Sequence, residues 1–263
     1  MRVAVYRVLI GSYDYVISDL FLDKNFDFYL FTDNPKLTLK KHKIIEIDRE
    51  ANASLQNRRL KILIPEILHS YDVVIYIDMN IKICSSINNI VRKFFLTNLD
   101  IAFCMHPYGH DLFEEVDSCI RNKQAKKERL NAELNYYEKS NLKARLPLSD
   151  NSFIIRRISN YKNKQYGEEW FSNVKKFSGR DQISFPYIRY KYDLKEMILQ
   201  FSPRNHNNEY FSVIPHKFSS IKNRKITFLK YLISFCIRYS LMYLKFIRFL
   251  TLNFFNKDFS HSK

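Results

Sequence analysis

Cysteine is scarce in this sequence, which has only four cysteines among 263 residues. The four are scattered, no two have the Cys-x-x-Cys spacing, and Cys84 and Cys104 lie in or next to predicted strands. The sequence therefore indicates neither a disulfide framework nor a zinc site built on cysteine. Reduced, mostly buried thiols are typical of a cytosolic protein, which is the localisation we expect.

A cleavable leader is also missing from the N-terminal pattern. The opening residues, MRVAVYRVLIGSYDYV, contain a short apolar run that Arg7 interrupts, and they have no small-residue cleavage site. We interpret residues 3–10 as a first strand and not as part of a signal peptide.

Acidic residues are in deficit, with 27 Asp and Glu against 43 Lys and Arg, which gives a formal net charge of +16. This charge favours phosphates, nucleic acid or anionic lipid as partners. The sequence has no zinc or helix-turn-helix signature and no interleaved aromatic and basic motif of an RNA-binding sheet, so we expect no nucleic-acid partner and keep nucleic-acid binding as a minor alternative. Apolar residues (46%) and aromatic residues (16%) are plentiful enough to build a core.

Alternating strand and helix patterns predict an α/β fold. Apolar runs followed by turn residues or polar breaks predict strands at residues 3–10, 26–34, 42–48, 71–78 and 100–106. Apolar residues on one helical face predict a helix at residues 54–70, which Pro65 is expected to kink. The alternation predicts a mostly parallel central sheet with helices on both faces, and in such sheets ligands bind at the carboxyl ends of the strands.

The stretch YDVVIYIDMNIKI (residues 71–83) places Asp78 at the end of a buried strand and Asn80 two residues later. Such oxygen ligands can hold a divalent cation, which in turn can bind a diphosphate. The spacing resembles the DxD element of GT-A glycosyltransferases, in which the metal neutralises the leaving diphosphate of a sugar donor. The alternative is an Asp that caps a strand-to-loop turn. Since Asn80 replaces the second acid, the site has one negative charge fewer and should bind a metal more weakly.

Seven blocks, in order over roughly residues 3–190, resemble a glycosyltransferase-like family first catalogued as a domain of unknown function. Its plant members are linked to cell-wall pectin and xylan, and its bacterial members occur in surface-polysaccharide clusters. The blocks are GSYD (11–14), FTDN (31–34), NRRLKILIPEIL (57–68), YIDMNIKI (76–83), HPYGHDLFEEVDSCI (106–120), SFIIRR (152–157) and WFSNVKKFSGRDQISFPYI (170–188).

The resemblance implies a GT-A-like fold over residues 1–221 and transfer of a sugar from a nucleotide-diphosphate donor. The implied acceptor is a surface polysaccharide, such as capsule or lipopolysaccharide, or a lipid-linked glycan. Because Asn80 departs from the usual motif, a catalytically inactive member that only binds glycan is an alternative.

Donor and metal residues are expected around the predicted strand end. Cations at Arg58 and Lys61 can reach donor phosphates, although a solvated helix face is an equal alternative. We predict that the donor site consists of Arg58, Lys61, Asp78 and Asn80. The expected cofactor is a divalent cation, Mn²⁺ or Mg²⁺, and a late histidine completes the metal site in several GT-A families. We prefer His216 to His206 because its local context, VIPH, is stiffer, and therefore predict metal ligands Asp78, Asn80 and His216.

The acceptor pocket is expected to contain His106, Glu114, Glu115 and Trp170. The alternative for the two glutamates is electrostatic, because acids in the first turn of a helix opened by Asp111 complement the helix dipole.

The run SGRDQISF (178–185) places a cation, an acid and an amide in one short segment, and resembles the Asp-Gln element of glycogenin-like enzymes. These groups suit binding of sugar hydroxyls and stabilisation of charge at the anomeric carbon. We predict Arg180, Asp181 and Gln182 as catalytic residues, with Asp181 foremost. The alternative is that Asp181 only caps a helix. Arg156 and Arg157 are expected to point to opposite faces of their strand.

The C-terminal segment, residues 222–263, is expected to be a separate basic amphipathic tail. It contains nine Lys or Arg and one Asp, a local charge of +8. If it is helical, Lys230, Arg238, Lys245 and Arg248 fall within a sector of roughly 80°. Such a helix has too many charges to span a bilayer and suits attachment to the anionic inner face of the cell membrane; packing on the domain is the alternative.

Overall fold

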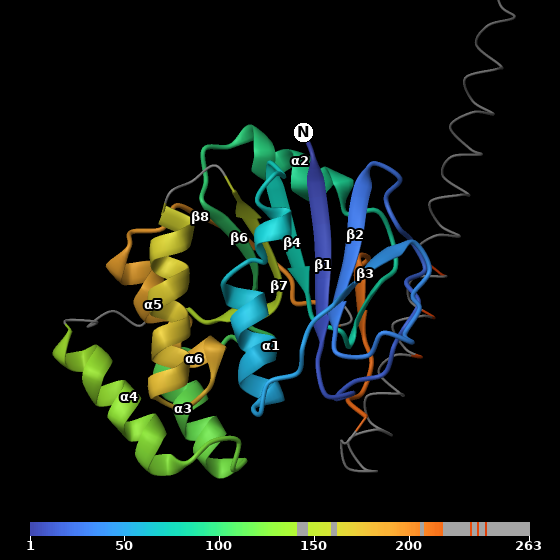
Figure 1. The fold of residues 1–263 in the computed structure, drawn as a ribbon. Helices are drawn as coiled ribbons and strands as arrows, with labels where there is room; N and C mark the ends of the chain where they lie inside the picture. The colour runs from blue at the N-terminus through green and yellow to red at the C-terminus, as the bar shows by residue number, and fades with distance from the viewer. Residues whose placement is uncertain are drawn as a thin grey trace, which may run out of the picture.

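The computed structural model describes residues 1–140, 147–158, 162–205 and 208–217, together with the isolated positions 232, 236 and 240. Its centre is a seven-stranded sheet with the strand order β3-β2-β1-β4-β7-β6-β8, in which only β7 runs antiparallel to its neighbours (Figure 1). The strands are β1 (Val3–Leu9), β2 (Phe26–Thr32), β3 (His42–Glu46), β4 (Val73–Ile77), β6 (Ile101–Met105), β7 (Ser149–Arg157) and β8 (Glu196–Leu199).

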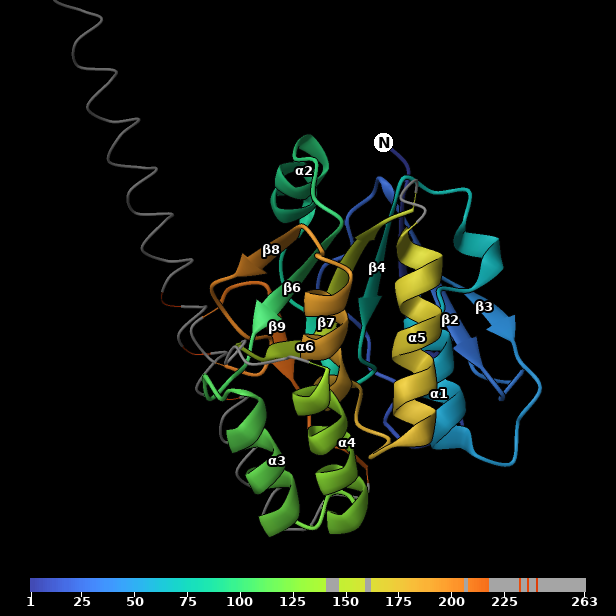
Figure 2. The same cartoon turned by 90° about the vertical axis from the view of Figure 1, so that its left-hand side faces the viewer.

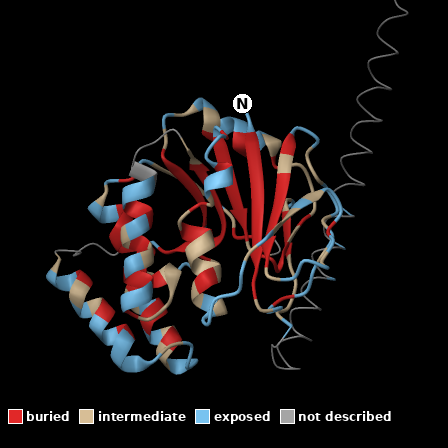
Figure 3. Cartoon of the chain, viewed as in Figure 1, coloured by how far each residue is buried: buried red, intermediate tan, exposed pale blue. Residues whose placement is uncertain are grey.

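Helices cover both faces of this sheet. One face packs against α1 (Ala53–Ile62), α5 (Lys162–Lys176) and α6 (Asp181–Lys191), with α3 (Leu112–Arg121) and α4 (Lys127–Lys139) joining the same core. The other face packs against α2 (Asn88–Leu96). Figure 2 shows the helices in these two layers, and Figure 3 shows that the central strands are buried along their length. This confirms the predicted α/β class, the mostly parallel sheet and its double cover.

A two-stranded antiparallel sheet adjoins the main one. It pairs β5 (Ile81–Ile83) with β9 (Phe211–Val213). The pairing continues as a hydrogen bond from the Ile214 amide to the Asn80 carbonyl (2.8 Å). It thereby brings the segment that carries His216 back to the strand end at Asp78.

The predicted helix over residues 54–70 is wrong in its length. α1 ends at Ile62, Leu63 is its C-cap, and a separate 3₁₀ turn, η1, spans Glu66–Leu68. Proline has no amide to donate and disfavours helical backbone in the residue before it. Ile64 is not helical and has a positive φ of 31°. Pro65 therefore breaks the helix and does not merely kink it.

Arg156 and Arg157 of β7 point to opposite faces of the sheet, as predicted, and each contacts the end of a helix. Arg156 is fully buried and donates to the carbonyls of Lys61 (2.6 Å) and Ile62 (2.6 Å) and to the Tyr6 hydroxyl (2.6 Å). Arg157 donates to carbonyls near the end of α2, including that of Thr97 (2.6 Å). Cations at these positions complement the negative ends of the helix dipoles. Arg156 thus fixes the end of α1 that carries Lys61.

We expect Arg156→Met to lower the free energy of unfolding by about 2–4 kcal/mol, because it leaves buried carbonyl and hydroxyl groups without a donor. Urea denaturation measures this change. The matched control is Arg129→Met, since Arg129 also donates to two carbonyls, those of Lys175 and Lys176, but is exposed, so we expect a change within about 1 kcal/mol. An equal loss in both variants would contradict the helix-end role of Arg156.

Among the described residues, no helix combines the length and apolar character needed to cross a bilayer. The predicted amphipathic tail, residues 222–263, lies outside the described residues apart from the three isolated positions.

Candidate functional site

A pocket of about 1030 Å³ opens where β1, β4 and β6 end, as expected for a mostly parallel sheet. Residues from α1, α3, β7, the start of α6 and the segments that follow β8 and β9 also line it. Most of the predicted site residues line it: Arg58, Lys61, Asp78, His106, Glu115, Arg180, Asp181, Gln182 and His216. Asn80, Glu114 and Trp170 do not.

Asp78 follows β4 and is held by three side chains. Its Oδ1 accepts from the Tyr76 hydroxyl (2.9 Å) and lies 3.7 Å from Lys61 Nζ, and its Oδ2 accepts from Arg204 (3.0 Å). Its amide donates to the Ser152 carbonyl (2.8 Å), which ties it to β7. Asp78 is therefore a fixed carboxylate with two cationic neighbours.

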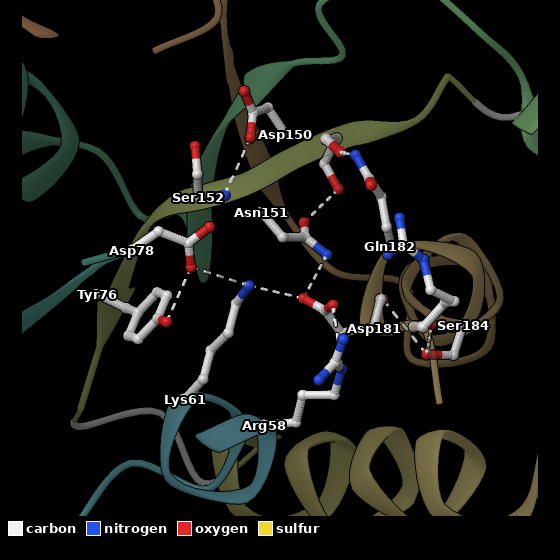
Figure 4. Close-up of polar contacts among 12 residues, drawn as sticks. Arg58, Lys61, Tyr76, Asp78, Asp150, Asn151, Ser152, Asp181, Gln182 and Ser184 are labelled. Carbon is white, nitrogen blue, oxygen red and sulfur yellow. Dashed lines mark hydrogen bonds and ion pairs between the residues drawn. The ribbon is translucent and has the colours of Figure 1, made fainter. Parts of the chain in front are cut away.

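Lys61 links this carboxylate to a second one, Asp181, at the start of α6. Its ammonium lies 2.7 Å from Asp181 Oδ2, and Figure 4 shows the side chain reaching up between the two acids. Arg58, one turn earlier on α1, lies 3.9 Å from Asp181 Oδ1. Burial by itself raises the pKa of Asp181, but the charges of Lys61, Arg58 and Arg180 outweigh it and hold that pKa well below its usual range. Asp181 is thus a permanently ionised carboxylate.

The remaining contacts of this segment position Asp181. Arg180 is the N-cap residue of α6, and Asp181 is the first helical residue and not the cap. Asn151 donates to Asp181 Oδ2 (3.4 Å), and Gln182 donates to the Ser149 carbonyl (2.8 Å). Both of these partners belong to β7, where the register with β6 shifts after Phe103 and leaves residues 151–153 without a partner in β6. Such irregularities commonly re-aim side chains beside active sites.

The prediction that Trp170 lies in the acceptor pocket is wrong. Its side chain is fully buried and stacks on Phe185 with ring centroids 4.3 Å apart. Its indole donates to the Asp181 carbonyl (3.0 Å). Trp170 is therefore a core residue that supports the backbone of Asp181, and it cannot touch an acceptor.

The two predicted acceptor glutamates have different roles. Glu114 does not line the pocket. Its carboxylate accepts a hydrogen bond from the Asp111 amide (2.9 Å) in a capping box at the start of α3. For Glu114 the helix-start alternative is correct. Glu115 is buried and lines the pocket, and Arg180 lies 3.8 Å from its Oε1.

Glu115 Oε2 faces two histidines, His110 Nδ1 at 3.1 Å and His106 Nε2 at 3.6 Å. The ligand atoms of these three residues lie within 4.8 Å of one another, so they are a candidate metal group. However, His106 Nδ1 accepts from the His110 amide (3.3 Å), and burial lowers the pKa of His106 despite the opposing charge of Glu115. A neutral His106 then carries its proton on Nε2, which faces the glutamate at a distance too long for a hydrogen bond. Of the two histidine contacts with Glu115, only that of His110 is a hydrogen bond, so the three residues remain a candidate metal group.

The predicted ligands Asp78, Asn80 and His216 do not fit a metal ion in this arrangement. Both oxygens of Asp78 are paired as described above. The Asn80 amide donates to the Ile214 carbonyl (3.3 Å), so the group 3.3 Å from His216 Nε2 is an N–H, while His216 Nδ1 lies 2.7 Å from Asp14. One feature favours an ion: Asn80 Oδ1 is buried and has no hydrogen-bond partner among the described residues. His206 lies outside the described residues.

Sequence reasoning missed several polar residues of the pocket, among them Asp14, Asp150, Asn151 and Arg204. Asp14 lies in the GSYD block, and Asp150 and Asn151 directly precede the SFIIRR block, so their place beside matched blocks was a usable signal. Arg204 follows the last block, and only the three-dimensional structure shows that it reaches Asp78.

The fold and the pocket together define a glycosyltransferase-like protein with a sheet consistent with the GT-A-like fold. The chain matches the model of the TOD1/MUCI70 glycosyltransferase-like domain over residues 43–216 and belongs to this family. This confirms the family predicted from the seven blocks, although the match begins and ends later than residues 3–190. No curated protein matches the chain. Family membership supports a transferase of the glycosyl type, acting on a sugar donor and a glycan acceptor, and GT-A-like enzymes often use a divalent cation.

Proposed function

We propose that this protein transfers a sugar from a nucleotide-diphosphate donor to a glycan acceptor, a surface polysaccharide such as capsule or lipopolysaccharide or a lipid-linked glycan. The observation that carries the proposal is the bridge of Lys61 between Asp78 and Asp181 in the pocket where β1, β4 and β6 end. It joins the strand-end acid expected at the donor diphosphate to the acid expected at the transferred sugar.

The cations of α1 support a donor site beside Asp78. Arg58 and Lys61 project from one helix into the pocket, and each lies within 4 Å of a carboxylate. Guanidinium and ammonium groups are the usual protein partners of phosphate oxygens. The donor diphosphate then lies along α1, with its sugar toward Asp181.

In the reaction, an acceptor hydroxyl oxygen bonds to the anomeric carbon of the sugar. The bond from that carbon to the diphosphate breaks, its electron pair stays on the diphosphate oxygen, and the departing diphosphate takes up the hydroxyl proton directly or through water. Positive charge grows on the sugar as the old bond breaks, and a fixed carboxylate beside it stabilises that charge. Because the pKa of Asp181 is strongly lowered, this electrostatic role suits it better than accepting a proton.

The acceptor end of the pocket is assigned to His106 and Glu115. Both line it, and Arg180 connects Glu115 to the segment of Asp181. Imidazole and carboxylate groups that line a pocket can form hydrogen bonds with sugar hydroxyls.

A panel of nucleotide-sugars and glycan acceptors tests this function through the release of nucleoside diphosphate. We expect release with at least one donor and faster release when the acceptor is present. A protein that binds glycan but releases no diphosphate from any donor is the inactive family member proposed as the alternative.

We also propose that residues 222–263 attach the protein to the inner face of the cell membrane, from their charge of +8. Replacing Lys230, Arg238, Lys245 and Arg248 by glutamine should weaken binding to phosphatidylserine vesicles by up to about a thousandfold, because each basic residue contributes about 1 kcal/mol. Vesicle co-sedimentation at low salt measures this. The control replaces four exposed lysines of the domain by glutamine: Lys40, Lys41, Lys126 and Lys127. Equal losses in both variants would show that net charge alone, and not the tail, binds the membrane.

A further inference from the structure

We propose that Arg204 is the resident counter-ion of the donor site, so that the donor diphosphate binds and departs without a divalent cation. The inference rests on the proposed function, because it concerns the same pocket. Arg204 would then neutralise the charge of the diphosphate, a role that was expected of a metal ion held by Asp78, Asn80 and His216.

The geometry of Arg204 is the first support. Its Nη2 donates to Asp78 Oδ2 (3.0 Å), and its Nε donates to Asp150 Oδ1 (3.4 Å). No hydrogen bond or ion pair joins Nη1 to another described residue, and the side chain is about a third exposed, at 32%, toward the pocket it lines. The guanidinium is thus held on one edge, and Nη1 is available to donate to a phosphate oxygen.

The segment around Arg204 is built to hold it in place. The Ser202 hydroxyl donates to Asp150 Oδ2 (2.5 Å) and accepts from the Arg204 amide (3.0 Å). Asn205 donates to the Pro107 carbonyl (3.2 Å), and Asp150 is itself buried. Both side chains that orient the guanidinium are therefore fixed, which is the preorganisation that electrostatic stabilisation needs.

Charge around Asp78 is the second support. Lys61 lies on its Oδ1 side and Arg204 on its Oδ2 side, so the carboxylate has two cationic side chains as neighbours. A metal at Asp78 has to displace Arg204, and a metal at His216 has to displace the Asn80 amide. A divalent ion also has to overcome the repulsion of both cations at close range.

The chemical consequence concerns the leaving group. When the bond between the anomeric carbon and the diphosphate oxygen breaks, the diphosphate gains one negative charge. Lys61 and Arg204 lie on either side of Asp78, so both can face that charge as it develops, as a metal does in metal-dependent transfer. Being permanently protonated, Arg204 provides this charge at every physiological pH.

The test measures binding of UDP, GDP, ADP, CDP and TDP to the full chain by titration calorimetry, in excess EDTA and in excess Mn²⁺. We expect at least one diphosphate to bind with nearly the same affinity in both solutions. Arg204→Met should weaken that binding in EDTA by about 10- to 100-fold, the contribution of a hydrogen bond to a charged group. The affinity of Arg204→Lys should lie between those of the natural chain and Arg204→Met, because lysine keeps the positive charge but cannot form the paired hydrogen bonds of a guanidinium.

The control is Arg59→Met, since Arg59 lies on α1 but pairs with Glu50 outside the pocket. We expect its diphosphate affinity to equal that of the natural chain. Binding that requires Mn²⁺, or binding in EDTA that Arg204→Met leaves unchanged, would overturn the inference while the proposed function stands. Absence of binding in both solutions would contradict the proposed function, and this inference with it.

Discussion

Replacing Asp181 by asparagine is expected to lower turnover by about 10²–10³-fold, the usual effect of removing one preorganised electrostatic group, while donor affinity changes little. The substitution keeps the size of the side chain and the backbone contact with Trp170 (3.0 Å). It removes the negative charge that Lys61 and Arg58 hold in place beside the expected position of the anomeric carbon. Single-turnover kinetics with saturating donor measures the effect.

Stability measurements on the same variant separate this role from a structural one. Because the folded-state pKa of Asp181 is lowered, its ionisation stabilises the fold above the unfolded-state pKa of about 3.9, and this contribution is lost as the pH falls through the folded-state pKa. The difference in unfolding free energy between the natural chain and Asp181→Asn should therefore be full at neutral pH and shrink below about pH 4. A variant that is less stable but fully active would contradict the catalytic role.

Replacing Asp78 by asparagine should abolish measurable transfer, with a loss of at least about 10²–10³-fold, the usual effect of removing one preorganised electrostatic group. Asp78 orients two cations, and without its charge Lys61 remains with Asp181 and Arg204 with Asp150. Because each cation keeps a partner and the Asp78 amide keeps its bond to Ser152, we expect the melting temperature to change little.

The matched control for Asp78→Asn is Asp72→Asn. Asp72 directly precedes β4 at its opposite end and pairs with the exposed N-terminus. Release of nucleoside diphosphate from the preferred donor should be unchanged in this control. Natural turnover in Asp78→Asn would remove Asp78 from the donor site.

Most strands of the central sheet were predictable because their patterns are local, whereas β8 (Glu196–Leu199) was not predicted. The buried run that ends at Asp78 and the alternation of strands and helices are properties of neighbouring residues, and they place ligands at the strand ends by general rules of α/β folds. The predicted helix over residues 54–70 was too long, because the spacing of apolar residues on one helical face does not show whether a proline kinks a helix or ends it. Local pattern thus gives the type of an element more reliably than its ends.

Part of the pocket lining was predictable from local sequence pattern. Lys61, Asp78 and Asp181 were chosen from strand ends and helix starts, and the structure brings these three together. Trp170 was wrongly placed, because its burial against Phe185 depends on tertiary packing, which residue spacing does not show. For Glu114 the spacing from Asp111 did indicate the helix-start alternative, and the capping box confirms it.

Arg204 shows the limit of sequence reasoning most clearly. It is separated from Asp78 by 126 residues and stands in a stretch with no strand or helix pattern. Its other partner, Asp150, lies 54 residues before it in the sequence. Only the fold, which lays the segment after β8 across the end of β4, makes this ion pair visible.

Thermal unfolding of the full chain with a panel of nucleotide-sugars, with and without Mn²⁺, tests the central claim most directly. A donor that binds only the folded state stabilises it by about 2.7 kcal/mol at a hundred times its Kd. We predict that at least one nucleotide-sugar raises the melting temperature, that its nucleoside diphosphate competes with it, and that Asp72→Asn behaves as the natural chain does. If no nucleotide-sugar raises the melting temperature in either solution, the pocket at Asp78, Lys61 and Asp181 is not a donor site.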